Sequence, residues 1–161
     1  TGYVSPSYGA RKAAPVVRLR VQNKLPVEFA TVLIPSVTRA DSEPDFRLLS
    51  RESDSVQAYS YSSGDTTDLF YFSLGSERWR FHAWESDATF LYCRQSKGRV
   101  VHLVLVNGSS VNHGSKSLIH HSHSIERFEW LKKGDANVTY CSHHTPVEHA
   151  LDREPELDSV S

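Results

Sequence analysis

The residues best suited to chemistry gather in the stretch "SLIHHSHSIE", where His120, His121 and His123 fall within four positions. The chain has nine histidines in 161 residues, and a third of them lie here. On a strand, residues two apart point to the same side, so His121 and His123 would share one face and His120 the other. A metal site, a proton-transfer centre and a polar surface strand are therefore the three interpretations to weigh.

A zinc site needs three or four nitrogen, sulfur or carboxylate donors in tetrahedral geometry. Strand pairing could supply further donors to the histidine cluster, namely His102, Cys141, His143 or His144. None of these spacings is diagnostic in the way that paired CxxC motifs or a helical HExxH are. We therefore favour the polar surface strand, with metal binding as the alternative.

Other catalytic groups have weaker support. No serine lies in a GxSxG elbow, and Cys93 sits in an apolar strand, where an inert thiol is expected. Cys93 and Cys141 could form one disulfide or remain two free thiols. The carboxylate pairs fall next to turns or on strand faces that we expect to be solvated; they are Asp65/Asp68 and Glu126/Glu129.

Aromatic residues recur along the predicted strands and offer a softer signal. Such rings can stack on sugars, although core packing explains most of them equally well. They are Tyr59, Tyr61, Tyr71, Trp79, Trp84, Tyr92, Trp130 and Tyr140.

The elements that would position these residues have a period of two rather than 3.6, which predicts strands. Apolar and polar residues alternate in "VVRLRVQ", whereas "VEFATVLI" (27–34) is apolar on both faces, as in a central strand. In "IERFEWL" (125–131) we expect one side to hold Ile125, Arg127, Glu129 and Leu131 and the other to hold Glu126, Phe128 and Trp130. In "RWRFHAW" (78–84) we expect Trp79 and Phe81 on one face and Trp84 on the other. Further strands are expected at 46–50, 56–62, 67–74, 88–94, 100–107, 117–121 and 136–141.

Turn signals separate these strands. The clearest is Asn107-Gly108, because both central positions of a type I′ hairpin turn need φ > 0 and this dipeptide tolerates it. Others are Ser63-Gly64-Asp65, His113-Gly114-Ser115 and Lys133-Gly134-Asp135.

Short strands at regular spacing predict an all-β fold, an antiparallel β-sandwich of about ten to twelve strands. We assign residues 1–142 to the sandwich and expect a polar, disordered tail over 143–161. The net charge of −1 gives no basic excess for a nucleic-acid partner. No apolar run approaches the roughly 18 residues that span a bilayer.

Two segments resemble heparinase II/III-like polysaccharide lyases. The opening "GYVSPSYGARKAAPVV" is similar to that family's "G-W-V-S-P-x-Y-G-x-R-x-x-A-P-V-L", with Tyr3 in place of the usual Trp, and it is followed by Leu25-Pro26. Later, "DATFLYC" and "LVLVNGS" are similar to the family's "D-A-x-F-L-Y" strand and "L-x-L-V-N-G-S" segment. The resemblance covers about residues 1–141.

The resemblance implies a lyase that joins an (α/α) toroid to a β-sandwich and cleaves an acidic, uronate-containing polysaccharide by β-elimination. The family's catalytic Asn, His and Tyr come largely from the toroid, and its zinc ligands from earlier sandwich strands. None of them maps onto this chain, so we assign it no catalytic, cofactor or metal residue. With no Met in the sequence, we expect a C-terminal portion whose partners are the polysaccharide and the toroid. The family implies a periplasmic or secreted bacterial protein.

For substrate contact we select Tyr8, which could stack on a sugar, and Arg11, which could pair with a carboxylate or sulfate. The alternative is that Tyr8-Gly9 is a turn whose ring packs inward. The alternative functions are a stand-alone carbohydrate-binding β-sandwich and a scaffolding one. If earlier strands are missing, the sandwich should expose a strand edge or an apolar face.

Overall fold

The computed structural model of the protein describes residues 2–4, 7–14, 16, 18, 20–22, 24, 30–32, 45–49, 55–75, 77–142 and 148–151. These residues form twelve strands and confirm the all-β, antiparallel, sandwich-like fold. The chain divides into two compact units, Thr1–Ile34 and Pro35–Ser161. Each unit is therefore described by itself.

The first unit contains one short antiparallel hairpin, in which β1 (Gly2–Val4) pairs with β2 (Lys12–Ala14). In the connecting loop the Ala10 amide donates to the Ser7 carbonyl at 3.1 Å, and Gly9 has φ of +79°. The strand that we expected at 16–22 is not seen in its described residues, 16, 18 and 20–22, which lie in no strand. Of the strand expected at 27–34 only residues 30–32 are described, and they lie in no strand either.

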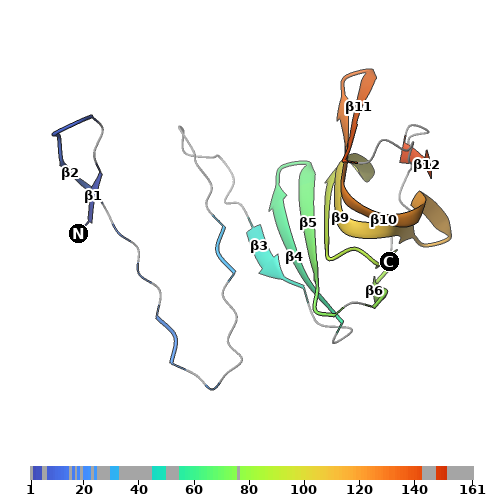
Figure 1. The fold of residues 1–161 in the computed structure, drawn as a ribbon, viewed down its shortest axis with the longest axis horizontal. Helices are drawn as coiled ribbons and strands as arrows, with labels where there is room; N and C mark the ends of the chain where they lie inside the picture. The colour runs from blue at the N-terminus through green and yellow to red at the C-terminus, as the bar shows by residue number, and fades with distance from the viewer. Residues whose placement is uncertain are drawn as a thin grey trace. The chain divides into compact units, whose positions relative to one another are not determined.

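The second unit contains a ten-stranded sheet whose main path runs β11-β10-β9-β8-β5-β4-β3 (Figure 1). Every pairing in it is antiparallel. Its strands are β3 (Asp45–Leu48), β4 (Val56–Ser63), β5 (Thr66–Ser73), β6 (Trp79–Phe81), β7 (Trp84–Ser86), β8 (Phe90–Ser96), β9 (Arg99–His113), β10 (Lys116–Lys133), β11 (Ala136–Cys141) and β12 (Glu148–His149). The turns predicted at Gly64, Gly114 and Gly134 join consecutive strands and all have positive φ.

The long hairpin of β9 and β10 makes the sheet sandwich-like, because both strands take part in two layers (Figure 1). The first half of β9 pairs with β8, and its last residues pair with β7. The end of β10 pairs with β11, whereas residues near its start pair with β12. The sheet therefore turns back over itself without a break in either strand.

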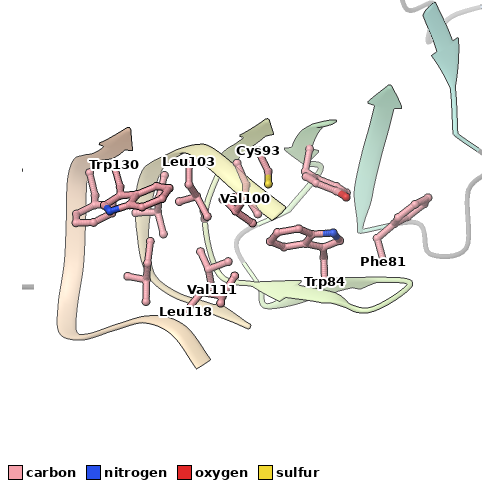
Figure 2. Close-up of a cluster of buried hydrophobic side chains, with 14 of the residues drawn as sticks. Phe81, Trp84, Cys93, Val100, Leu103, Val111, Leu118 and Trp130 are labelled. Carbon is pink, nitrogen blue, oxygen red and sulfur yellow. The ribbon is translucent and has the colours of Figure 1, made fainter. Parts of the chain in front are cut away.

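The core lies inside this fold. Trp130, Leu103 and Cys93 face Val111 and Leu118 across the interior, and Trp84 and Phe81 lie at the other end of the cluster (Figure 2). The Trp79 indole donates to the Ala88 carbonyl at 2.8 Å, and its ring stacks on Tyr71 at 5.3 Å between centroids. Burial of large aromatic side chains contributes most of the apolar area removed from water.

The prediction of a hairpin turn at Asn107-Gly108 is wrong, because β9 runs through both residues. Only Asn107 has a positive φ, of 50°, and the strand bends there instead of reversing. A Cβ added to Gly108 would lie 2.6 Å from the Ala88 Cα, so only glycine allows this close approach. The hairpin reverses later, at Gly114 and Ser115.

Asp87 fixes the chain that crosses this bend. Its carboxylate accepts hydrogen bonds from the Ser109 amide at 2.8 Å and the Ser110 amide at 2.9 Å, and from both serine hydroxyls. Burial alone would raise the pKa of Asp87, but these hydrogen bonds outweigh burial and lower the pKa. The bend is thus held by a charged acceptor from the preceding loop.

Residues 78–84 also differ from the prediction of a single strand. They form β6, a two-residue turn at His82-Ala83 with His82 at φ of 49°, and the start of β7. Because the chain reverses, Trp84 is buried together with Trp79 and Phe81 rather than on the opposite face.

The segment that we expected to be a polar tail contributes to the fold where it is described. In β12, His149 pairs with Ile119 and Glu148 with His120. The Ala150 amide donates to the Leu118 carbonyl at 3.0 Å, and Leu151 joins the buried core. The sandwich therefore includes residues 148–151, which lie beyond the boundary at 142. Residues 143–147 and 152–161 lie outside the described part.

Candidate functional site

The side of the β3–β11 layer that points away from the core carries a continuous array of aromatic and charged side chains, which we call the outer face. Its residues alternate with core residues, as the pleat of a strand requires. Strand register aligns them in three rows that cross the sheet. The rows are Leu48, Tyr59, Phe70, Tyr92, Val104, Glu129 and Tyr140; Phe46, Tyr61, Asp68, Arg94, His102, Leu131 and Val138; and Gln57, Phe72, Phe90, Val106 and Arg127.

Rings on the outer face form a connected set. Phe72 contacts Phe90 with ring centroids 5.0 Å apart, and Phe46 stacks on Tyr59 at 5.5 Å. Tyr59 and Phe72 meet edge to face at 6.1 Å, so these four rings are continuous. Phe72 remains 43% exposed although it lies within this set. Tyr59 in the middle of the set is only 7% exposed, so the surface that this set offers to a ligand is mainly the ring of Phe72.

Asp68 anchors the polar part of the outer face. Arg94 binds its carboxylate with two hydrogen bonds, from Nε at 2.7 Å and from Nη2 at 3.0 Å. The Tyr92 hydroxyl donates to the same carboxylate at 2.8 Å. Asp68 is only 5% exposed, so we were wrong to expect a solvated carboxylate here. The bidentate geometry fixes the direction of the Arg94 guanidinium.

A second ionic group continues across β9, β10 and β11. The Arg127 guanidinium donates to Glu129 at 2.7 Å, and Nε2 of His102 lies 3.0 Å from the other oxygen of Glu129. Hydrogen bonds from Arg127 and His102, in that order, lower the pKa of Glu129. Arg127 also approaches the exposed Tyr140 ring, with 6.0 Å from the guanidinium carbon to the ring centroid.

The two ionic groups decide what the outer face can do chemically. Burial and the hydrogen bond to Asp68 raise the pKa of Tyr92, so its phenol stays protonated and donates at neutral pH. Tyr92 is therefore unsuited to act as a general base. Arg94 and Arg127 each pair with a carboxylate and keep further N–H groups, while the rings offer flat apolar surface. This combination suits the binding of a hydroxyl-rich ring more than proton abstraction.

The histidine cluster lies elsewhere, on a bulge of β10. Pairing with β9 jumps from His120↔Ser110 to Ile125↔Gly108, which leaves residues 121–124 as the bulge. Nδ1 of His121 lies 2.8 Å from the His123 carbonyl oxygen, and Nδ1 of His123 lies 2.8 Å from the Ser122 hydroxyl. These contacts are local, as expected for a polar surface strand.

The donors that we considered as partners do not join the cluster. His102 lies opposite Leu131, toward the other end of β10, and Cys141 lies opposite Phe128. His143 and His144 lie outside the described residues. Among the residues that the structure describes, no group of three or more His, Cys, Asp or Glu side chains could hold a metal ion.

The residues that we selected for substrate contact lie in the loop of the β1–β2 hairpin. The Tyr8 ring is fully exposed, and Arg11 is exposed as well. Within the first unit Tyr8 does not pack inward, contrary to the alternative interpretation. Its accessibility is compatible with sugar stacking, and the contact itself stays a prediction.

Cys93 and Cys141 are both free thiols. Cys93 is buried in the core, and burial raises its pKa, so this thiol is inert, as expected.

The aromatic residues that we singled out divide between the core and the outer face. Tyr71, Trp79, Trp84 and Trp130 belong to the core, whereas Tyr59, Tyr61, Tyr92 and Tyr140 lie on the outer face.

Sequence reasoning missed Arg94, His102 and Arg127 as members of one face. The alternation of Arg127 and Glu129 in "IERFEWL" was the one usable signal, because residues two apart share a face. Arg94, a partner of Asp68, and His102, a partner of Glu129, come from other strands, 26 and 27 positions along the chain. Only strand register brings these residues together.

A comparison with models of protein families found no family that matches the chain, and a comparison with curated proteins found no match. Within the described residues, no helix is long and apolar enough to cross a membrane.

Proposed function

We propose that the chain is the β-sandwich portion of a lyase that cleaves a uronate-containing polysaccharide by β-elimination, and that this portion holds the polysaccharide. The proposed site is the outer face. The carrying observation is that the exposed rings of Phe72 and Tyr140 share this face with the oriented guanidinium groups of Arg94 and Arg127. The resemblance of the opening segment and of two later strands to heparinase II/III-like lyases supplies the substrate class.

The division of labour follows from the chemistry of the face. Rings such as Phe72 and Tyr140 would stack on sugar units, and the remaining N–H groups of Arg127 would meet a uronate carboxylate. The protonated phenol of Tyr92 leaves the face without a tyrosinate base. We therefore place proton abstraction outside the described residues.

Binding and cleavage can be measured separately on the same chain. Titration calorimetry with heparan sulfate and with alginate should detect binding, and dextran serves as the uncharged polymer. The chain should release no unsaturated uronate from the same polymers. The ultraviolet absorbance of that product is the measurement. Cleavage by this chain would contradict the holding role, and binding to neither uronate polymer would leave scaffolding as the function.

Two matched pairs of variants locate the binding site. Phe72→Ala should weaken binding about tenfold, whereas Val21→Ala, which also trims an exposed apolar side chain but lies in the first unit, should not. Arg127→Gln should weaken binding, whereas Arg80→Gln should not, although Arg80 is also an exposed arginine paired with a glutamate. Equal effects within either pair would contradict a site on the outer face.

A further inference from the structure

Strand β11 (Ala136–Cys141) forms one end of the path through the sheet. It pairs with β10 on one side, and no other strand of the described residues pairs with it. Figure 1 shows β11 and the end of β10 as a hairpin that projects from the rest of the second unit. Five of the six residues of β11 are exposed, and the sixth is half-buried. We call the side of β11 that points away from β10 the β11 edge.

The hydrogen bonds to β10 determine which backbone groups lie at the β11 edge. The Ser142 amide donates to the Arg127 carbonyl at 2.9 Å, so these two residues form a hydrogen-bonded pair of the antiparallel ladder. Hydrogen-bonded pairs alternate along such a ladder, so the register makes Tyr140 and Val138 members of the next two pairs. The residues between them direct their backbone amide and carbonyl groups to the β11 edge; they are Asn137, Thr139 and Cys141.

The composition of β11 favours pairing with a further strand. Edge strands usually carry a charge, a proline or a bulge, which prevents pairing with another chain. Strand β3, at the other end of the path, has such a feature in the ion pair of Asp45 and Arg47. The sequence of β11, "ANVTYC", contains no charge and no proline, and its register with β10 is unbroken. Its Val138 and Tyr140 side chains are 49% and 55% exposed.

A second copy of β11 matches the β11 edge in one antiparallel register. With Thr139 opposite Thr139 of a second copy, the residues whose backbone groups point outward pair only with one another. Val138 of each copy then lies opposite Tyr140 of the other, and a β-branched residue opposite an aromatic one stabilises a sheet. No like charges meet, because β11 carries none. Moving the two-fold axis to a neighbouring residue would pair Asn137 or Cys141 with a residue outside β11.

We propose that two copies of the chain associate through the β11 edge, so that their sheets join into one antiparallel sheet with a two-fold axis at Thr139. The pairing closes after two copies, because each copy has then used its β11 edge. The contact is one strand wide, so we expect a weak dimer rather than an obligate one. The outer faces of both copies lie on the same side of the joined sheet. The association needs no polysaccharide and does not depend on the function proposed above.

Sedimentation equilibrium of the whole chain, without polysaccharide, measures the association. We expect a monomer–dimer equilibrium. Thr139→Lys places two ammonium groups opposite each other and should raise the dissociation constant at least about tenfold. Leu48→Lys, at an exposed position of β3, is the matched control and should leave the dissociation constant unchanged. The proposal is overturned by a chain that stays monomeric up to about 1 mM, by assembly beyond a dimer, or by equal effects of the two variants.

Disulfide formation tests the position of the two-fold axis by a second route. The background is Cys141→Ser, which leaves Cys93 buried in the core. The Cα atoms of a hydrogen-bonded pair lie about 5.5 Å apart, within the range of a disulfide, so Thr139→Cys should form a covalent dimer on mild oxidation. Asp135→Cys, in the exposed turn before β11, is the control. It should cross-link at least about fivefold more slowly, because docking does not bring its two copies together. Equal rates would overturn the proposed register.

Discussion

At the scale of single residues, Asp87 connects electrostatics to the shape of the chain. Its carboxylate accepts the amides of Ser109 and Ser110 directly after the bend at Asn107-Gly108. Hydrogen bonds to a charged acceptor are among the stronger ones in proteins. The bend is therefore expected to depend on the ionisation of this group.

Replacement of Asp87 tests this dependence. Asp87→Asn should lower the free energy of unfolding at pH 7 by about 1–3 kcal/mol, because the hydrogen bonds lose their charged acceptor. Since the pKa of Asp87 is lowered in the folded chain, its contribution is complete above the unfolded pKa of about 3.9 and is lost as the pH falls further. Urea titrations should show that the difference in free energy of unfolding between the parent and Asp87→Asn is smaller near pH 3 than at pH 7. Asp65→Asn, in an exposed turn, is the control. If the difference in free energy of unfolding between the parent and Asp87→Asn stays constant with pH, the stabilising role of the ionised Asp87 is contradicted.

Thiol reactivity tests the burial of the core. The folded chain should react with a disulfide reagent at Cys141 but not at Cys93, which becomes reactive only on unfolding. Counting thiols with and without denaturant measures this, and Cys141→Ser should abolish the fast reaction. Equal rates for both thiols would contradict a rigid core around Cys93.

At the scale of elements, the period-two pattern predicted most of the strands between 45 and 141. The sides expected for residues 127–131 of "IERFEWL" are confirmed, but those expected for Ile125 and Glu126 are wrong, because Ile125 is buried in the core and Glu126 is exposed. Phe128 and Trp130 face the core, opposite Glu129 and Leu131. The path of β9 and the turn at His82-Ala83 could not be predicted. A glycine beside an asparagine has the same local preference in a turn and in a bent strand, and the choice depends on Ala88, which is distant in sequence.

Gly108 is the position where this choice can be tested. Gly108→Ala should lower the free energy of unfolding by about 1–3 kcal/mol, because its Cβ would overlap the Ala88 backbone. Gly75→Ala is the control, since its Cβ would meet nothing within 4 Å and its φ is not positive. Thermal or urea unfolding measures both. A Gly108→Ala chain as stable as the parent would show that the two segments can separate at no cost.

At the scale of the whole molecule, the core cluster belongs entirely to the second unit. The described buried residues begin at Val56 and end at Leu151, with Leu49 packed against them. The first unit contributes one short hairpin. Stability can therefore be assigned to the second unit, which also carries the outer face.

Removal of residues 1–34 tests this assignment. The shortened chain should keep a single cooperative transition and a melting temperature within about 3 °C of the parent, because the core is retained. The same chain lacks Tyr8 and Arg11, so any loss of polysaccharide affinity would be attributable to the removed unit. A broad transition or a large fall in melting temperature would show that the second unit needs the first.

The two-layer role of β9 and β10 has a consequence for how the protein opens. Hydrogen exchange often reveals units that unfold separately, but here no layer can open without breaking bonds of the same two strands. Amides near Leu105 and Val111, in different layers, should therefore exchange through one common opening with the same free energy. Within the second unit, the two layers that share this hairpin therefore have one common opening event.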